Sequence, residues 1–376
     1  MKFVIDRGVL IDKLSTLIIV CGKKNIANPI LQNVKIDTED GKITFTATDL
    51  DTIIKNTVNI LVDNKGSTTV CAQTLFEIVK KMNDGAQISM EYKDEDNILL
   101  VSSGRSKFKL PCLNADDYPY FEEIESEYEF PIATQAFAKM IDKTRFAISN
   151  DESRYYLTGL FLHSKCIDDE YFYCGATTDG HKLAFVKIPQ NEKNIMFNGI
   201  IIPKKTLGEI RKLLETQEEE VTVSFSSTKI KIATKETTLI SKLINADFPE
   251  YSKVIPQNNR FEAIIDKKEF SSALNRVSTI AEEKTKGVSF NFSKDVLSMV
   301  ANNAGDTGYA DEEVKVQYEG EDIQIGFNSR YVLEIISQIE SDFISIKIDN
   351  PNTPVLIKGT EENDELFVLM PMKVWF

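Results

Sequence analysis

The hydrophobic positions of this chain repeat one pattern three times. In each copy a short strand-like run contains an isoleucine, and apolar residues follow it at the spacing of one helix face. The three sets are Ile5, Leu10 and Leu14, then Ile132, Phe137 and Ile141, then Ile265, Phe270 and Leu274. Because residues four apart lie on one face of a helix, each set predicts a strand followed by an amphipathic helix.

A second helical stripe recurs later in each copy, with the form apolar-x-Glu-Ile-x-x-x-apolar. It starts at Leu75, at Leu207 and at Val332, so successive stripes lie 132 and 125 residues apart. Two independent signatures at matching places indicate an internal repeat. A chain of 376 residues is long enough for three cores of ordinary size, and we predict domains at 1–127, 128–256 and 257–376.

Between the predicted helices, apolar and polar residues alternate with a period of two. This alternation is typical of strands in a sheet with one buried face. The clearest runs are residues 42–48, 221–225, 229–233, 289–292 and 342–348. The pattern predicts an α+β fold, in which each copy has a mostly antiparallel sheet with two helices packed on one face.

The chain offers few residues for catalysis. Of its two histidines, His163 lies in an alternating strand pattern and is expected to face outward, while His181 follows Asp179 in a T-D-G-H-K-L segment. One interpretation is an enzyme that uses His181 and Asp179, but the sequence contains no P-loop, G-x-S-x-G or H-E-x-x-H motif. The five cysteines form no C-x-x-C pair. We therefore expect no enzymatic activity, no cofactor and no metal site.

The net charge of −14 argues against tight binding to nucleic acid, because such binding depends on basic residues that displace counterions from phosphates. Lysines and arginines nevertheless recur on the predicted helices of all three copies, and together they could offer a weakly attractive surface to a polyanion. No long uncharged apolar run is present, and Asp6 and Arg7 interrupt the first positions. We expect no membrane span, no signal peptide and a cytoplasmic location.

Several short motifs, taken in order, resemble the family of bacterial DNA polymerase III beta subunits, the sliding clamps. The resemblance extends over essentially the whole chain. The motifs are residues 1–3 (MKF), 46–50 (TATDL), 103–106 (SGRS), 154–159 (RYYLTG), 178–184 (TDGHKLA), 248–251 (FPEY), 325–328 (IGFN) and 368–372 (VLMPM). Each motif alone is weak evidence, but all of them at compatible spacing in a triply repeated chain are specific.

The resemblance implies three clamp-type domains and a head-to-tail homodimer that closes into a ring of six domains. Helices would line the hole and sheets would form the outer wall. A closed ring stays on double-stranded DNA by topology, so loose and sequence-independent contacts suffice despite the acidic charge. The DNA-facing residues that the resemblance implies are Lys24, Lys80, Tyr155, Tyr156, Lys204 and Lys205.

The resemblance also implies a hydrophobic cleft between the second and third domains. The replicative polymerase, the clamp loader and repair and translesion polymerases would dock there by short linear motifs. The residues implied are Arg154, Leu157, Thr178, Gly180, His181, Lys182, Leu183, Pro249, Val254, Asn328, Tyr331, Val368, Met370, Pro371 and Met372. The apolar 368–372 segment suits such a cleft on physical grounds, although Leu366 and Leu369 could equally belong to a last core strand. The chain then continues to Trp375 and Phe376, which would lie beside the cleft.

The dimer interface implied by the resemblance joins the edge strand of domain one to that of domain three in the neighbouring copy. Arg105, Lys107 and Lys109 would face acidic residues there, with Ile280 packing nearby. Besides the enzyme, one other alternative stays open: a three-domain scaffold that binds peptides and never encircles DNA.

Overall fold

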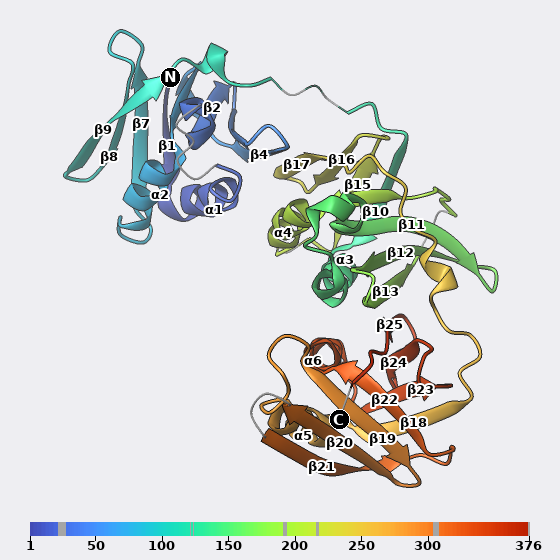
Figure 1. Cartoon of the computed structure of the whole chain (residues 1–376). Helices are drawn as coiled ribbons and strands as arrows, with labels where there is room; N and C mark the ends of the chain where they lie inside the picture. Colours follow the sequence, from blue (N-terminus) through green and yellow to red (C-terminus); the bar gives the residue numbers. More distant parts are fainter. Residues whose placement is uncertain are drawn as a thin grey trace. The chain divides into compact units, whose positions relative to one another are not determined.

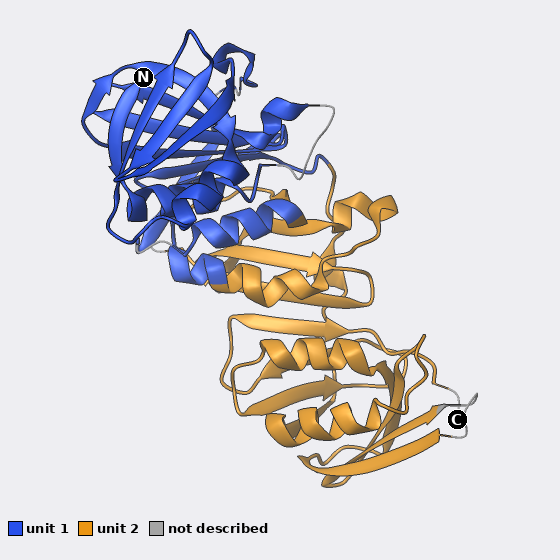
Figure 2. Ribbon diagram, turned by 90° about the vertical axis from the view of Figure 1, so that its left-hand side faces the viewer, with its two compact units in different colours: residues 1–138, 205–245 blue, residues 139–204, 246–376 orange. Residues whose placement is uncertain are grey.

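The computed structural model describes residues 1–21, 28–120, 122, 124–190, 194–215, 218–303 and 308–374. The chain forms two compact units (Figure 2). Unit 1 contains Met1–Ala138 and Lys205–Asn245, and unit 2 contains Lys139–Lys204 and Ala246–Phe376. Within the described residues, each unit is built on one sheet, and every strand pair in both sheets is antiparallel.

All six predicted helices are present (Figure 1). They are α1 (Arg7–Leu17), α2 (Ala72–Lys80), α3 (Thr134–Thr144), α4 (Lys204–Leu213), α5 (Lys267–Val277) and α6 (Ser329–Gln338). Asp6 and Asp266 start α1 and α5, because their carboxylates accept hydrogen bonds from the first free amides, at 2.7 Å from Gly8 N and 2.8 Å from Glu269 N. The apolar positions of the predicted stripes are buried except Ile78 and Met82, which are half-buried, so the helix prediction is confirmed.

The sheet of unit 1 runs in the order β10-β15-β16-β17-β4-β3-β2-β6-β9-β8-β7-β1-β5 among the described residues. Its strands are β1 (Lys2–Asp6), β2 (Asn33–Glu39), β3 (Lys42–Thr48), β4 (Thr52–Asn59), β5 (Val62–Asn64), β6 (Gly66–Cys71), β7 (Gln87–Lys93), β8 (Ile98–Ser103), β9 (Ser106–Leu113), β10 (Tyr128–Ala133), β15 (Glu220–Phe225), β16 (Lys229–Ala233) and β17 (Thr237–Lys242). The predicted strands at 42–48 and 229–233 coincide with β3 and β16.

The sheet of unit 2 runs, over the part of the chain that is described, in the order β14-β11-β12-β13-β25-β24-β23-β18-β21-β20-β19-β22. Its strands are β11 (Gly159–Ile167), β12 (Glu170–Thr178), β13 (Lys182–Pro189), β14 (Ile200–Pro203), β18 (Phe261–Asp266), β19 (Gly287–Ser293), β20 (Val296–Asn303), β21 (Gly308–Gln317), β22 (Ile323–Asn328), β23 (Phe343–Ile348), β24 (Val355–Gly359) and β25 (Glu365–Leu369).

Strands of the second predicted copy are divided between the two sheets. In unit 1, β17 pairs with β4, with Leu239 opposite Ile54. In unit 2, β13 pairs with β25, with Leu183 opposite Val368. Each sheet therefore continues from one copy of the repeat into the next, while the domain boundaries 1–127, 128–256 and 257–376 stay a prediction.

The last strand, β25, settles the alternative raised for the apolar C-terminal segment. Leu369 is 1% exposed and belongs to the core of unit 2, whereas Met370 just after it is 37% exposed. The core-strand interpretation is therefore confirmed for Leu369. Among the helices of the described residues, none is long and apolar enough to cross a membrane.

Candidate functional site

A cavity of about 280 Å³ lies in unit 2, where four stretches of the chain meet. Its lining residues are Tyr156, Leu157, Thr178, Gly180, His181, Lys182, Leu183, Pro249, Glu250, Tyr251, Val254, Val368 and Met370. They come from the residues before β11, from the turn between β12 and β13, from the segment around the short helix η5 (Tyr251–Lys253), and from the end of β25. A pocket of this size can take in one or two side chains of a ligand.

The floor of the cavity is apolar and well packed. Leu157, Leu183 and Val368 are each at most 4% exposed, and the β13–β25 ladder places Leu183 beside Val368. At the rim, Val254 and Met370 remain 41% and 37% exposed. A buried apolar floor with exposed apolar rims is suited to anchor a hydrophobic side chain from a partner.

One wall of the cavity is the turn from Thr178 to Lys182. The Thr178 hydroxyl donates to the Lys182 carbonyl at 2.7 Å, and the Asp179 carboxylate accepts from the backbone amides of His181 and Lys182, both at 2.9 Å. Gly180 has a φ of +90°, in the left-handed region that favours glycine. The Asp179 carboxylate is therefore used to build the turn, and its contacts with His181 are to the backbone rather than the ring, which gives no catalytic pair.

Lys182 lines the cavity, but its ammonium group is directed to acidic groups of the protein itself. Lys182 Nζ lies 2.9 Å from Asp179 Oδ2 and 3.1 Å from Glu334 Oε2. It also lies 4.0 Å from the centre of the Tyr331 ring, and the residue is only 6% exposed. The Lys182 charge thus has partners within unit 2 before any ligand binds.

His163 supports the cavity from behind, and the prediction that it faces outward is wrong. It is 8% exposed, its Nε2 lies 2.8 Å from the hydroxyl of Tyr251, and its ring stacks on Phe161. Burial lowers the pKa of His163 below the usual value, so the ring is neutral near pH 7. Because Tyr251 lines the cavity, this buried contact fixes one of the cavity walls.

Ten of the fifteen residues predicted for the cleft lie on the cavity lining, and five do not. Tyr331 is in the layer behind it, where its ring stacks on His181 with centroids 6.1 Å apart. Arg154 Nη1 would lie 3.0 Å from a Cβ added at Gly180, so this side chain borders the turn. The other three are Asn328, which caps the N-terminus of α6, and Pro371 and Met372, which follow β25 toward β22 through a hydrogen bond from Met372 N to Gly326 O (2.8 Å).

Three lining residues were not predicted for this cleft: Tyr156, Glu250 and Tyr251. Tyr156 was instead predicted to face DNA beside Tyr155, which is 54% exposed. The signal that could have identified Tyr251 is the FPEY motif, since its proline, Pro249, was already assigned to the cleft.

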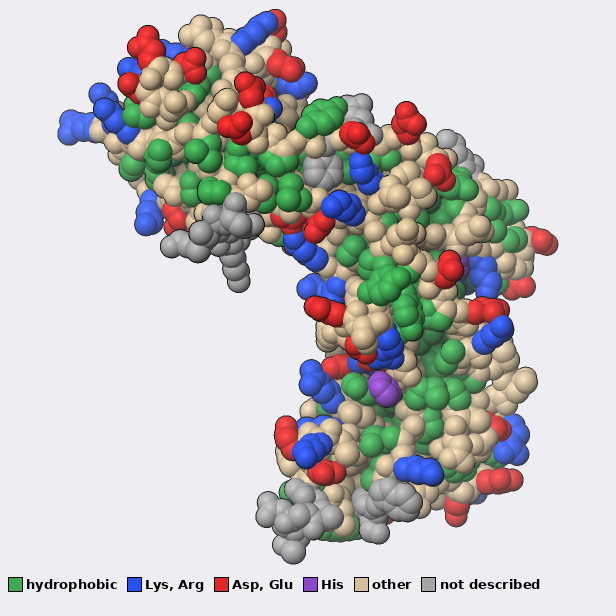
Figure 3. Space-filling view, turned by 45° about the horizontal axis from the view of Figure 1, so that its top comes forward, with side chains coloured by type: hydrophobic (Ala, Val, Ile, Leu, Met, Phe, Trp, Pro, Cys, Tyr) green, Lys and Arg blue, Asp and Glu red, His purple; other side chains and the backbone are tan. Residues whose placement is uncertain are grey.

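The predicted DNA-facing lysines have different environments. Lys80 is exposed at the end of α2, and Lys205 is exposed on α4 and forms an ion pair with Asp49. Lys204 is half-buried and donates to Asn150 Oδ1 at 2.7 Å. Lys24 lies outside the described residues, as do Trp375 and Phe376. On the face drawn in Figure 3, acidic and basic side chains are interspersed, with hydrophobic side chains between them.

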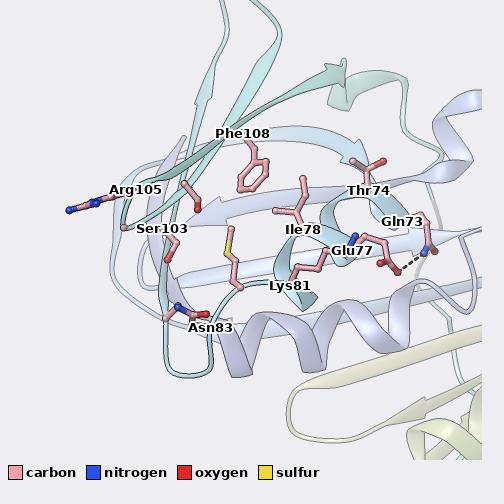
Figure 4. Close-up of a pocket in the computed structure, with 13 residues that line it drawn as sticks. Gln73, Thr74, Glu77, Ile78, Lys81, Asn83, Ser103, Arg105 and Phe108 are labelled. Atoms are coloured by element: carbon pink, nitrogen blue, oxygen red, sulfur yellow. Dashed lines mark hydrogen bonds between the residues drawn. The ribbon is translucent and has the colours of Figure 1, made fainter.

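Arg105, one of the predicted interface residues of unit 1, borders a second, larger cavity of about 690 Å³ (Figure 4). Ile78 and Met82, from α2 and the residues after it, and Phe108 of β9 provide its apolar part, and Arg105 lies at its edge. Lys107 and Lys109 are exposed on β9. Over Ser106–Pro111, β9 pairs with β8 on one side, and the described residues place no strand on its other side.

The corresponding residues of unit 2 lie on β21 and after α5. From Gly308 to Lys315, β21 pairs with β20, and the described strands leave its other side open. Asp311 and Glu313 are exposed on this strand, and Glu312 pairs with Arg276 of α5. Ile280 is half-buried just beyond α5.

Comparison with known proteins agrees with the resemblance over the whole chain. The N-terminal, central and C-terminal domain families of the DNA polymerase III beta subunit match residues 1–122, 131–250 and 252–373. The beta sliding clamp of Caulobacter vibrioides (strain NA1000 / CB15N) is 36% identical over 374 residues, which is 100% of both chains.

Solved structures give the same result. The DNA polymerase sliding clamp from Caulobacter crescentus has a TM-score of 0.94 at 35% identity, with 100% of both chains covered. A sliding clamp from Bartonella birtlesii bound to griselimycin has a TM-score of 0.93 at 34% identity, again over 100% of both chains. The chain therefore belongs to the DNA polymerase III beta subunit family, the bacterial sliding clamps, which are processivity factors and not enzymes.

Proposed function

We propose that two copies of the chain associate head to tail into a closed ring that encircles duplex DNA in the cytoplasm. In this proposal the cavity of unit 2 binds short linear peptides of the replicative polymerase, the clamp loader and repair and translesion polymerases. The protein would then keep these partners on DNA by enclosure, with no cofactor.

The observation that supports the ring proposal is a pair of edge strands of opposite charge, both open on one side among the described strands. Lys107 and Lys109 are exposed on β9, and Asp311 and Glu313 are exposed on β21. Edge strands of opposite charge favour pairing between copies and disfavour pairing of like edges. Because the two edges belong to different ends of the chain, their pairing is heterologous and can close into a ring. The apolar part of the cavity beside β9, formed by Ile78, Met82 and Phe108, would take up Ile280 of the second copy.

In this proposal the ring contacts DNA only weakly. The exposed lysines on α2 and α4 are few, and Lys205 is already neutralised by Asp49. A protein with net charge −14 gains little from counterion release, so retention by topology explains how it could stay on DNA and still move along it.

The test is loading onto nicked circular DNA, followed by cutting of the circle. We expect the protein to stay on the circle and to leave after linearisation, and equal retention on both forms would refute enclosure. The peptide-scaffold alternative predicts no retention on either form. In parallel, Ile280→Asp should convert dimers to monomers in light scattering, and an unchanged mass would contradict the proposed interface.

A further inference from the structure

The turn that forms one wall of the cavity in unit 2 is built a second time in unit 1. In unit 1 the Thr48 hydroxyl donates to the Thr52 carbonyl at 2.8 Å. The Asp49 carboxylate accepts from the backbone amides of Asp51 at 3.0 Å and of Thr52 at 2.8 Å. These are the same donors and acceptors, in the same order, as those of the Thr178–Lys182 turn.

The last residue of the two turns differs, being Thr52 in one and Lys182 in the other. Since the turn has the same hydrogen bonds with threonine there, a lysine is not needed for its shape. Lys182 adds two contacts with α6: its Nζ lies 4.0 Å from the centre of the Tyr331 ring, and it forms an ion pair with Glu334 at 3.1 Å. This pair connects the cavity wall to a helix of the third repeat, and Lys182 is only 6% exposed.

Glu334 belongs to the Glu-Ile signature that repeats in the second helix of each copy. Its counterpart in α4 is Glu209, which is buried whereas Glu334 is half-buried, and there the turn ends in Thr52, which carries no charge. Glu334 has two cationic neighbours, because its Oε1 accepts from Arg330 Nε at 3.1 Å while its Oε2 faces Lys182. The glutamate is therefore shared between an exposed arginine and the buried lysine.

We propose that Glu334 is a positioning residue for the peptide cleft, acting through Lys182 to fix the Thr178–Lys182 wall against α6. This inference rests on the proposed function of the cavity. Without the Glu334 charge, the buried ammonium of Lys182 keeps only Asp179 as a counterion and gains by moving toward solvent. That movement takes the backbone of His181 and Lys182 with it, and it widens the site that a ligand must fill.

The first measurement is binding of griselimycin to the full chain by calorimetry. Glu334→Gln, which removes the charge and keeps the shape, is expected to weaken binding about tenfold. The matched control is Glu77→Gln, since Glu77 holds the same place in α2, is half-buried and, within the described part of the chain, accepts only from Gln73 at 3.3 Å. An equal loss in both variants would overturn the proposal.

A third variant separates this inference from the proposed function. Val254→Glu places a charge on the exposed rim of the cavity and should abolish griselimycin binding. If Val254→Glu binds normally, the proposed role of the cavity is wrong. If Val254→Glu loses binding while Glu334→Gln binds as the wild type does, the cavity is the site and the positioning role of Glu334 is refuted.

The second measurement follows the backbone of the turn itself and needs no ligand. Hydrogen exchange of the 178–183 segment should become faster in Glu334→Gln and stay unchanged in Glu77→Gln, because only the former loses the ion pair between the turn and α6. A Lys182→Met, Glu334→Gln double variant should exchange no faster than Lys182→Met alone. If Glu334→Gln does not fold, Glu334→Asp enters the same assays, and wild-type exchange in that variant refutes the proposal.

Discussion

Replacing Lys143 by methionine is expected to destabilise the protein, and more strongly as the pH rises above 7. Lys143 is 5% exposed, and its Nζ lies 2.9 Å from Glu365 Oε1 and 3.1 Å from Glu340 Oε1. It also donates to the carbonyl of Gln338. Methionine replaces most of the side-chain volume but leaves the Glu365 carboxyl, itself 4% exposed, without its nearest cation.

The magnitude follows from the protonation of Glu365. Burial, together with a hydrogen bond to Glu362, raises the pKa of Glu365 from 4.5 to about 7 although Lys143 opposes the shift. Between these two values the folded state keeps a proton that the unfolded chain has lost, so stability falls as pH rises through this window and then levels off. Without Lys143 the pKa rises beyond 7, and the fall continues by about 1.4 kcal/mol per pH unit.

At pH 8 we expect a total cost of about 3 to 5 kcal/mol, the range for removing one partner of a buried ion pair. The cost should be about 1 kcal/mol smaller at pH 7, because the variant loses about 1.4 kcal/mol over this pH unit while the wild type, with a Glu365 pKa of about 7, loses only about 0.4 kcal/mol. The raised pKa of Lys143 lies above this range and adds no slope between pH 6 and 8.

The assay is urea unfolding at pH 6, 7 and 8, followed by far-ultraviolet circular dichroism at one chain concentration. The control is Lys139→Met on the same helix. Lys139 is 47% exposed in its side chain and lies 3.6 and 3.8 Å from Glu340 and Glu365, so its loss should cost less than about 1 kcal/mol. A difference between Lys143→Met and wild type that is the same at all three pH values would refute the reasoning.

Three further predictions concern single residues. The lowered pKa of His163 makes wild-type stability fall as pH drops below about 6.5, because the unfolded chain then binds a proton that the folded state does not. His163→Gln should lose this pH dependence in calorimetry at pH 5.5 and 7.5. An equal change of the unfolding temperature between the two pH values in both proteins would contradict this prediction. Gly180→Ala should lower the free energy of unfolding by about 1 kcal/mol or more, because φ is +90° and the new Cβ would lie 3.0 Å from Arg154 Nη1. An unfolding midpoint equal to that of the wild type in thermal unfolding would exclude this strain. Burial raises the pKa of Glu209 above 4.5, so stability falls as pH rises past that value. Glu209→Gln should therefore stabilise the protein more at pH 8 than at pH 5. A larger stabilisation at pH 5 would show that the direction of the Glu209 pKa shift is wrong.

The helices and several strands could be predicted from the sequence because their signals are local. The stripe of Phe270 and Leu274 repeats that of Leu10 and Leu14, and all four side chains are fully buried. Strand alternation was informative for the same reason, since successive side chains point to opposite faces of a sheet.

Alternation alone could not show whether the second face of a strand is covered. His163 lies opposite the core side of β11, and the sequence therefore suggested solvent. In the structure, Phe248 and Tyr251 from the segment before β18 pack over that face, so His163 and Phe161 lie beneath them. This covering depends on a contact between residues far apart in the chain, which no local pattern reports.

The cleft residues were predicted by resemblance, but their contacts were not. Ten of the predicted residues line one cavity, yet the direction of the Lys182 ammonium depends on Glu334, which lies in another copy of the repeat. The sequence contained the relevant signal, since Glu334 is part of the helical signature. What it lacked was the pairing of β13 with β25, which brings the two together.

The sheets that continue from one copy of the repeat into the next also limit how the polypeptide can be divided. A fragment limited to the middle copy would remove β25 from β13 and β4 from β17, and so leave two unsatisfied rows of backbone amides and carbonyls. Bare edges of this kind recruit other chains, and such a fragment would tend to precipitate or to swap strands with its neighbours. Dissection of this protein should therefore keep each pair of neighbouring copies intact.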